Sequence, residues 1–120
     1  LRLQITATGL FTYPDVMIVC GKPQFLDGVF DTLLNPSVLI EILSDSTKNY
    51  DRGEKFEHYR RLDSLREYLT IAQDKVHIEH WVRQEDGRWI LTEYDDEAAS
   101  LEILGASHTI SAIYEDVEFD

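Results

Sequence analysis

Residues 38–43 read Val-Leu-Ile-Glu-Ile-Leu, an apolar run interrupted by the single carboxylate of Glu41. The run is short and bounded by Pro, Asn and Ser, which predicts a buried strand. Alternation along a strand places Leu39, Glu41 and Leu43 on one face. Burying an ionised carboxylate without a partner is costly, so we expect Glu41 to be neutralised, paired or bound to a cation.

A second carboxylate, Asp15, lies in another apolar run, between Tyr13 and Cys20. This run predicts a buried strand near residues 14–20. If the two strands are neighbours, oxygens of Asp15 and Glu41 could share one Mg²⁺, which prefers oxygen ligands and retains several waters. A turn-capping role for Asp15 after a proline stays open as the alternative.

The only strong helix signal covers about residues 50–62. Spacings of three and four residues put Asp51, Lys55, Tyr59 and Leu62 on one stripe. Tyr59 and Leu62 are expected to face the body of the protein, which draws Lys55 towards the sheet. Lys55 beside the two carboxylates could position water or stabilise charge on a phosphate. Two alternatives remain: a surface pair with Asp51, or a structural ion pair with Glu41.

The rest of the chain predicts one domain, residues 1–120, with an α/β fold built on a mixed central sheet and a flanking helix. The long connection at residues 21–37 should fold onto the body, and Asp86-Gly87 predicts a hairpin turn. Further strands are expected near residues 1–7, 67–72, 76–83, 88–94 and 101–104.

The composition of the chain limits the kinds of function and the cellular compartment that we expect. The net charge of −12 disfavours loose attachment to nucleic acid or anionic membrane, but a nuclease site must itself be acidic to hold a metal. Apolar stretches are too short to span a membrane. The only cysteine, Cys20, is expected in the core, and a reducing, cytoplasmic compartment fits. All four histidines are assigned surface or packing roles, with His77 and His80 on opposite faces of their strand.

These residues, taken together, resemble a bacterial family. Pro14-Asp15, residues 39–44 and Ser46-Thr47, followed by Asp51, Lys55 and Tyr59, resemble the pattern of the Uma-two family of restriction-endonuclease-like proteins, in the PD-(D/E)xK nuclease superfamily. The stretches at residues 66–69 and 113–117 are similar to the same family's downstream pattern. The resemblance covers nearly the whole chain.

The resemblance implies that Asp15 and Glu41 are the acidic residues of the superfamily motif and hold Mg²⁺ or Mn²⁺. The motif lysine would fall at Leu43, and Lys55 from the following helix is its match. The family also has N-terminal elements that nothing here matches, so residues upstream of Leu1 are expected to be missing from the domain.

Two functions follow as expectations. The first is a metal-dependent endonuclease with DNA as substrate and Asp15, Glu41 and Lys55 as catalytic residues. The second is a non-catalytic interaction module that keeps the nuclease fold, as a homo-oligomer for example, with Glu41 and Lys55 as a structural pair. A different hydrolase using the same metal stays open, because a fold does not fix a function.

Overall fold

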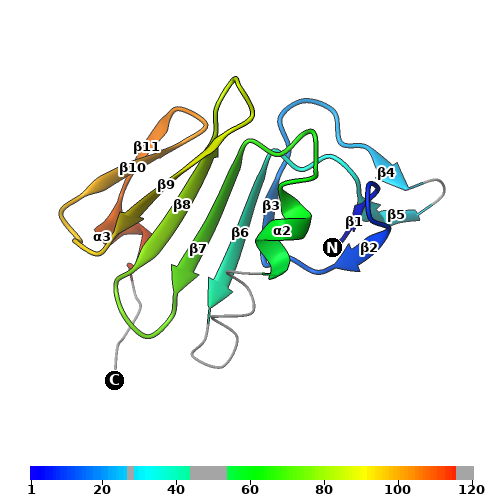
Figure 1. Ribbon diagram of the computed structural model, residues 1–120. Helices are drawn as coiled ribbons and strands as arrows, with labels where there is room; N and C mark the ends of the chain where they lie inside the picture. Colours follow the sequence, from blue (N-terminus) through cyan, green and yellow to red (C-terminus); the bar gives the residue numbers. More distant parts are fainter. Residues whose placement is uncertain (27–28, 44–53, 116–120) are drawn as a thin grey trace.

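The computed structural model describes residues 1–26, 29–43 and 54–115, and in these residues strands predominate (Figure 1). The strands are β1 (Arg2–Ile5), β2 (Leu10–Thr12), β3 (Val16–Ile18), β4 (Phe25–Leu26), β5 (Val29–Leu33), β6 (Val38–Leu43), β7 (Glu67–Ala72), β8 (Ile78–Arg83), β9 (Trp89–Tyr94), β10 (Ser100–Ile103) and β11 (Ala106–Thr109). The helices are α2 (Phe56–Tyr59) and α3 (Ile110–Ile113). Across these residues, no helix has the length and apolar character needed to cross a membrane.

The largest sheet has five strands in the order β3-β6-β7-β8-β9. Neighbouring strands are antiparallel except β6 and β7, which run parallel. Parallel neighbours need a crossover connection, and the chain between β6 and β7 includes α2. The strands predicted at residues 38–43 and 67–72 are confirmed at those bounds, and those near 76–83 and 88–94 are confirmed as β8 and β9.

The prediction of one sheet is wrong. The first strand joins a separate four-stranded sheet of order β2-β1-β5-β4, and β10 pairs with β11 in a third. Two of these strands, β4 and β5, lie in the segment predicted as a connection. Its apolar residues do fold onto the body, but they do so by pairing: Leu3 on β1 lies opposite Leu33 on β5, and both are buried. The short strands carry too little periodicity to show this in the sequence.

The two faces of the central sheet have separate cores. On one face, Phe56 of α2 stacks on Tyr68, with ring centroids 5.6 Å apart, and contacts Trp81 at 5.2 Å. The buried members of this core are Leu3, Ile5, Leu39, Tyr59, Leu62, Leu65 and Tyr68. The opposite face packs on β10 and α3, through Val38, Leu69, Ile78, Leu101, Ile110 and Tyr114.

Two local expectations need correction. The helix predicted over residues 50–62 ends earlier, since α2 ends at Tyr59; its first predicted residues, 50–53, lie outside the described ranges. Cys20 is exposed rather than in the core. It follows the end of β3 at Ile18, and its N–H donates to the Ser37 hydroxyl at 3.0 Å.

Tyr114 fastens the turn between β7 and β8. Its hydroxyl donates to the carbonyl of Ala72 at 2.8 Å and accepts from the backbone N–H of His77 at 3.2 Å. Burial raises the pKa of the Tyr114 hydroxyl, with the hydrogen bond from the His77 backbone acting in the opposite direction. The neutral hydroxyl is therefore part of the folded structure.

Tyr114→Phe should reduce the loss of stability at alkaline pH. A folded-state pKa above the unfolded value means that the stabilisation is complete at neutral pH and is lost as pH rises through the folded pKa, above about pH 10. At neutral pH the variant should lose about 1 kcal/mol through its missing hydrogen bonds. Urea unfolding between neutral and alkaline pH measures both effects. Tyr13→Phe, at an exposed tyrosine, is the control; equal alkaline slopes for the two variants would contradict the assignment.

Candidate active site

Glu41 lies on β6, an inner strand of the five-stranded sheet next to the edge strand β3, and is 3% exposed. Leu39 and Leu43 are buried as well, whereas Ile42 is exposed, which confirms the predicted alternation. The sheet therefore carries a carboxylate on the face that packs against α2. This position requires polar or charged partners for Glu41.

Helix α2 and its N-cap residue supply those partners. The Tyr59 hydroxyl donates to Oε1 of Glu41 at 2.7 Å, and Nζ of Lys55 lies 3.6 Å from Oε2. The Lys55 side chain is 23% exposed, so its ammonium group reaches both the carboxylate and solvent. The predicted placement of Lys55 towards the sheet, with Tyr59 facing the body, is confirmed. Asp51, the other member of that stripe, lies outside the described residues.

Asp15 differs from the expectation in its burial. It precedes β3 rather than lying within it, and it is exposed. Its Oδ2 accepts a hydrogen bond from the backbone N–H of Ile42 at 2.7 Å. β3 and β6 do pair as expected, with Val16 opposite Ile40. Extending this antiparallel register by one residue places the Asp15 backbone next to Glu41. The side chain thus crosses to the neighbouring strand and does not cap a local turn.

The register of the sheet extends a polar row beyond Glu41. Glu41 lies opposite Thr70 on β7, Thr70 opposite Glu79 on β8, and Glu79 opposite Glu93 on β9. Directly opposed residues share a face, so this row runs across the sheet on the α2 side. Sequence analysis did not identify Glu79 or Glu93. Glu79 has one apolar neighbour, Ile78, and one histidine neighbour, His80, which is a weaker signal than the two isoleucines beside Glu41.

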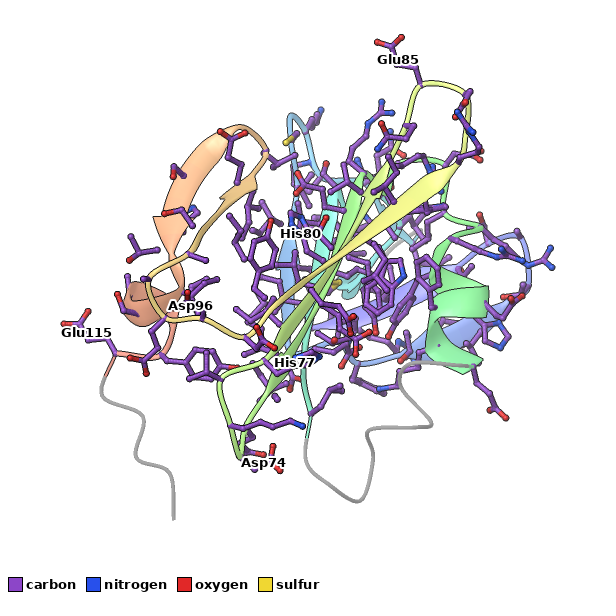
Figure 2. The ribbon with its side chains drawn as sticks, turned by 60° about the vertical axis from the view of Figure 1, so that its left-hand side comes forward. Asp74, His77, His80, Glu85, Asp96 and Glu115 are labelled. Carbon is purple, nitrogen blue, oxygen red and sulfur yellow. The ribbon has the colours of Figure 1, made fainter. Side chains whose placement is uncertain are left out.

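His77, directly before β8, and His80, on β8, lie on opposite faces of the sheet, as predicted. His77 lies next to the turn that carries Asp74 (Figure 2). Its Nε2 is 3.8 Å from Oε1 of Glu79, on the α2 side of the sheet. His80 lies further along the strand, and its Nε2 is 2.6 Å from Oε1 of Glu67 in a buried hydrogen bond. The second oxygen of Glu67 accepts from the backbone N–H of Leu104 at 2.7 Å. His80 and Glu67 therefore connect the central sheet to the loop after β10.

Residues 1–111 match the model of a protein family, Uma2, described as "Putative restriction endonuclease". The chain belongs to the Uma2 family. This result confirms the resemblance to Uma-two that the sequence pattern indicated.

Two curated proteins of Synechocystis sp. are similar to this Uma2 chain. "Uncharacterized protein sll1609" is 38% identical over 102 residues, which cover 85% of this chain and 58% of that protein. "Uncharacterized protein slr1290" is 32% identical over 120 residues, which cover 99% of this chain and 62% of that protein. The chain thus spans about three fifths of the length of these relatives.

One crystal structure shares the fold. It is described as that of "a putative nuclease belonging to DUF820 from Anabaena variabilis", and it matches with a TM-score of 0.72 at 16% sequence identity. The match covers 94% of this chain and 64% of that one. At this identity the likeness concerns the fold alone.

Proposed function

We propose that this Uma2 protein is a metal-dependent endonuclease that hydrolyses DNA phosphodiester bonds, with Asp15, Glu41 and Lys55 as its catalytic residues. The observation that carries the proposal is the buried Glu41 carboxylate, held by Tyr59 and Lys55 on a strand that also binds the Asp15 side chain. The description of the family names the same class of activity.

The donor set suits Mg²⁺, with Mn²⁺ as a substitute. Asp15 and Glu41 offer carboxylate oxygens, the ligands that Mg²⁺ prefers. A carboxylate has about four lone-pair sites, so each group can keep its hydrogen bonds and still bind a cation. Mg²⁺ usually retains waters and binds one or two protein carboxylates together with substrate phosphate. Two carboxylates are therefore sufficient.

In the proposed reaction, water attacks phosphorus and the bond to the leaving oxygen breaks. A bound cation would polarise a phosphoryl oxygen and make the attacking water more acidic. The ammonium group of Lys55 donates to phosphate oxygens as negative charge develops on them. Tyr59 is a positioning residue, because its hydroxyl fixes the Glu41 carboxylate. The Ile42 backbone does the same for Asp15.

Binding of DNA requires a positively charged surface, although the net charge of the protein is −12. A cleft of about 420 Å³ next to the end of the β8–β9 hairpin supports this part of the proposal, because its lining holds three arginines and a single carboxylate: Arg60, Arg61, Arg83 and Asp63, with Gly87 and Trp89. The Arg83 guanidinium lies 4.7 Å over the Trp89 ring and donates to the Arg60 carbonyl at 2.7 Å. Arginines so placed suit phosphate contacts, which position a duplex without reading its sequence.

A non-catalytic module is the second candidate function. The Lys55–Glu41 ion pair by itself favours a structural role, and the position of the motif lysine holds Leu43, which is buried. In such a module, the nuclease fold would serve interaction with another protein or with a second copy of the chain.

Metal titration tests the proposal. The wild-type chain should bind Mg²⁺ and Mn²⁺ in isothermal titration calorimetry and cleave plasmid DNA only when one of these ions is present. Asp15→Asn should weaken ion binding by at least about tenfold, since it removes one of two charged ligands. The Asn side chain keeps an oxygen for the Ile42 N–H.

Asp96→Asn is the matched control for this titration. Asp96 is also exposed, and its Oδ1 accepts from the backbone N–H of Ala98 at 2.9 Å, as Oδ2 of Asp15 does from Ile42. It should bind ions and cleave DNA like the wild type. Unchanged ion binding in Asp15→Asn, or cleavage that persists in a chelator, would reject the assignment.

A further inference from the structure

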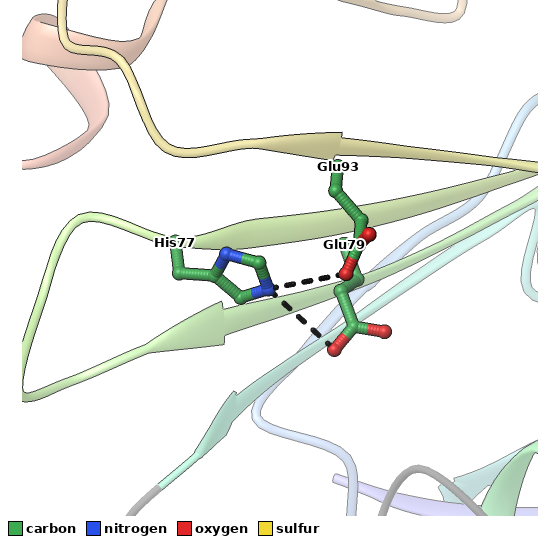
Figure 3. Close-up of side chains that lie close together, drawn as sticks. All are labelled: His77, Glu79 and Glu93. Atoms are coloured by element: carbon green, nitrogen blue, oxygen red, sulfur yellow. Dashed lines mark ion pairs between the residues drawn. The ribbon is translucent and has the colours of Figure 1, made fainter.

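A second group of potential metal ligands lies two strands away from Glu41. His77 precedes β8, Glu79 lies on β8, and Glu93 lies opposite Glu79 on β9. Each offers one ligand atom, and these three atoms all lie within 4.8 Å of one another. Figure 3 shows the ring nitrogen of His77 directed at both carboxylates.

The separations in this group suit a shared cation better than hydrogen bonds. Nε2 of His77 is 3.8 Å from Oε1 of Glu79 and 3.5 Å from Oε1 of Glu93, beyond the ~2.7–2.9 Å of a charge-assisted hydrogen bond. Ligands about 2.1 Å from a tetrahedral ion stand roughly 3.4 Å apart. Glu93 has a side chain that is 57% exposed, so it can rotate to complete this geometry.

The charges in the group also favour a cation. The Glu79 side chain is 5% exposed and lies directly opposite Glu93. Like charges opposite one another destabilise a sheet. A divalent ion would offset both carboxylates.

We propose that His77, Glu79 and Glu93 form a second cation site, which takes a divalent transition-metal ion of the zinc class. The imidazole of His77 indicates this class of ion, because nitrogen ligands suit Zn²⁺ whereas Mg²⁺ prefers oxygen ligands alone. Three protein ligands leave a coordination position for water or another molecule.

The second site is independent of the proposed nuclease function. Thr70 on β7 lies between Glu41 and Glu79 in the cross-strand row, so the backbones of the two sites are roughly 10 Å apart. The backbone of His77 is held in place, since its N–H donates to Tyr114 and its carbonyl accepts from the N–H of Ala72 at 2.9 Å. A bound ion would fasten the edge strand β9 to β8 through Glu93.

Calorimetric titration with ZnCl₂ in excess Mg²⁺ tests the site on the whole chain. The wild type should bind Zn²⁺, and Glu93→Gln and His77→Ala should each weaken that binding by at least about tenfold. Zn²⁺ should also raise the melting temperature of the wild type more than that of either variant. Both replaced side chains are partly exposed, and far-ultraviolet circular dichroism verifies that the variants fold.

Glu102→Gln and His108→Ala are the matched controls, because both residues are exposed and lie on β10 and β11. They should bind Zn²⁺ like the wild type. Asp15→Asn should do so as well, whatever its effect on Mg²⁺, which separates this site from the proposed nuclease centre. Equal Zn²⁺ affinity in the wild type, Glu93→Gln and His77→Ala would overturn the proposal, as would loss of Zn²⁺ binding in Asp15→Asn.

Discussion

Glu41→Gln is expected to lower Mg²⁺-dependent DNA cleavage by at least about 100-fold while the protein stays folded. The substitution removes the negative charge that holds the cation, and electrostatic groups of this kind contribute factors of ~10²–10³ when removed singly. The amide oxygen of glutamine can still accept the Tyr59 hydrogen bond, which measures 2.7 Å in the wild type. The Lys55 ammonium group loses this carboxylate charge but is 23% exposed and can be hydrated, so the loss should appear mainly in activity and only slightly in the unfolding transition.

Plasmid nicking at several Mg²⁺ concentrations, with thermal unfolding of the same samples, measures both parts of this prediction. Glu102→Gln is the matched control, as an exposed strand glutamate outside the site. Cleavage by Glu41→Gln at the wild-type rate would remove Glu41 from the reaction. A large fall in melting temperature would instead favour the structural role that the second candidate function gives to Glu41.

Patterns within one element predicted most of what proved correct. The alternation in residues 38–43 predicted the strand, its buried face and the presence of a buried carboxylate, Glu41, on that face. Helical spacing in the next segment predicted that Lys55 and Tyr59 face the sheet, and both side chains contact that carboxylate. In both cases the information is local, since side chains two residues apart on a strand, or four apart on a helix, share a face.

Features that depend on pairing between elements were predicted less well. Asp15 was assigned to a buried strand, but the first hydrogen-bonded position is Val16. The pairing of Glu79 with Glu93 needs the exact hairpin register. A two-residue turn at Asp86-Gly87 would place Glu79 opposite Tyr94, whereas the observed connection pairs Arg83 with Trp89 and Glu79 with Glu93. A shift of one residue reverses every face, so turn chemistry alone could not locate this group.

Lys55→Met is expected to lower the free energy of unfolding by about 2–4 kcal/mol in the absence of divalent ions. Removing one partner of a buried ion pair leaves the other charge poorly compensated, which typically costs ~3–5 kcal/mol. The Lys55 side chain is 23% exposed, so solvent reduces that cost. Urea unfolding in a chelator measures the effect. The double variant Glu41→Gln/Lys55→Met should recover most of the loss, since neither charge then remains.

The same variants separate the two candidate functions. If Glu41 binds a cation, saturating Mg²⁺ should restore much of the stability that Lys55→Met loses, because the ion binds the folded state and compensates the carboxylate. No such recovery is expected in Glu41→Gln/Lys55→Met, which lacks the ligand charge. A non-catalytic module predicts the same loss with and without Mg²⁺, since Lys55 would be the required counter-ion of Glu41. The Mg²⁺ dependence of unfolding therefore distinguishes a metal ligand from a structural ion pair without an activity assay.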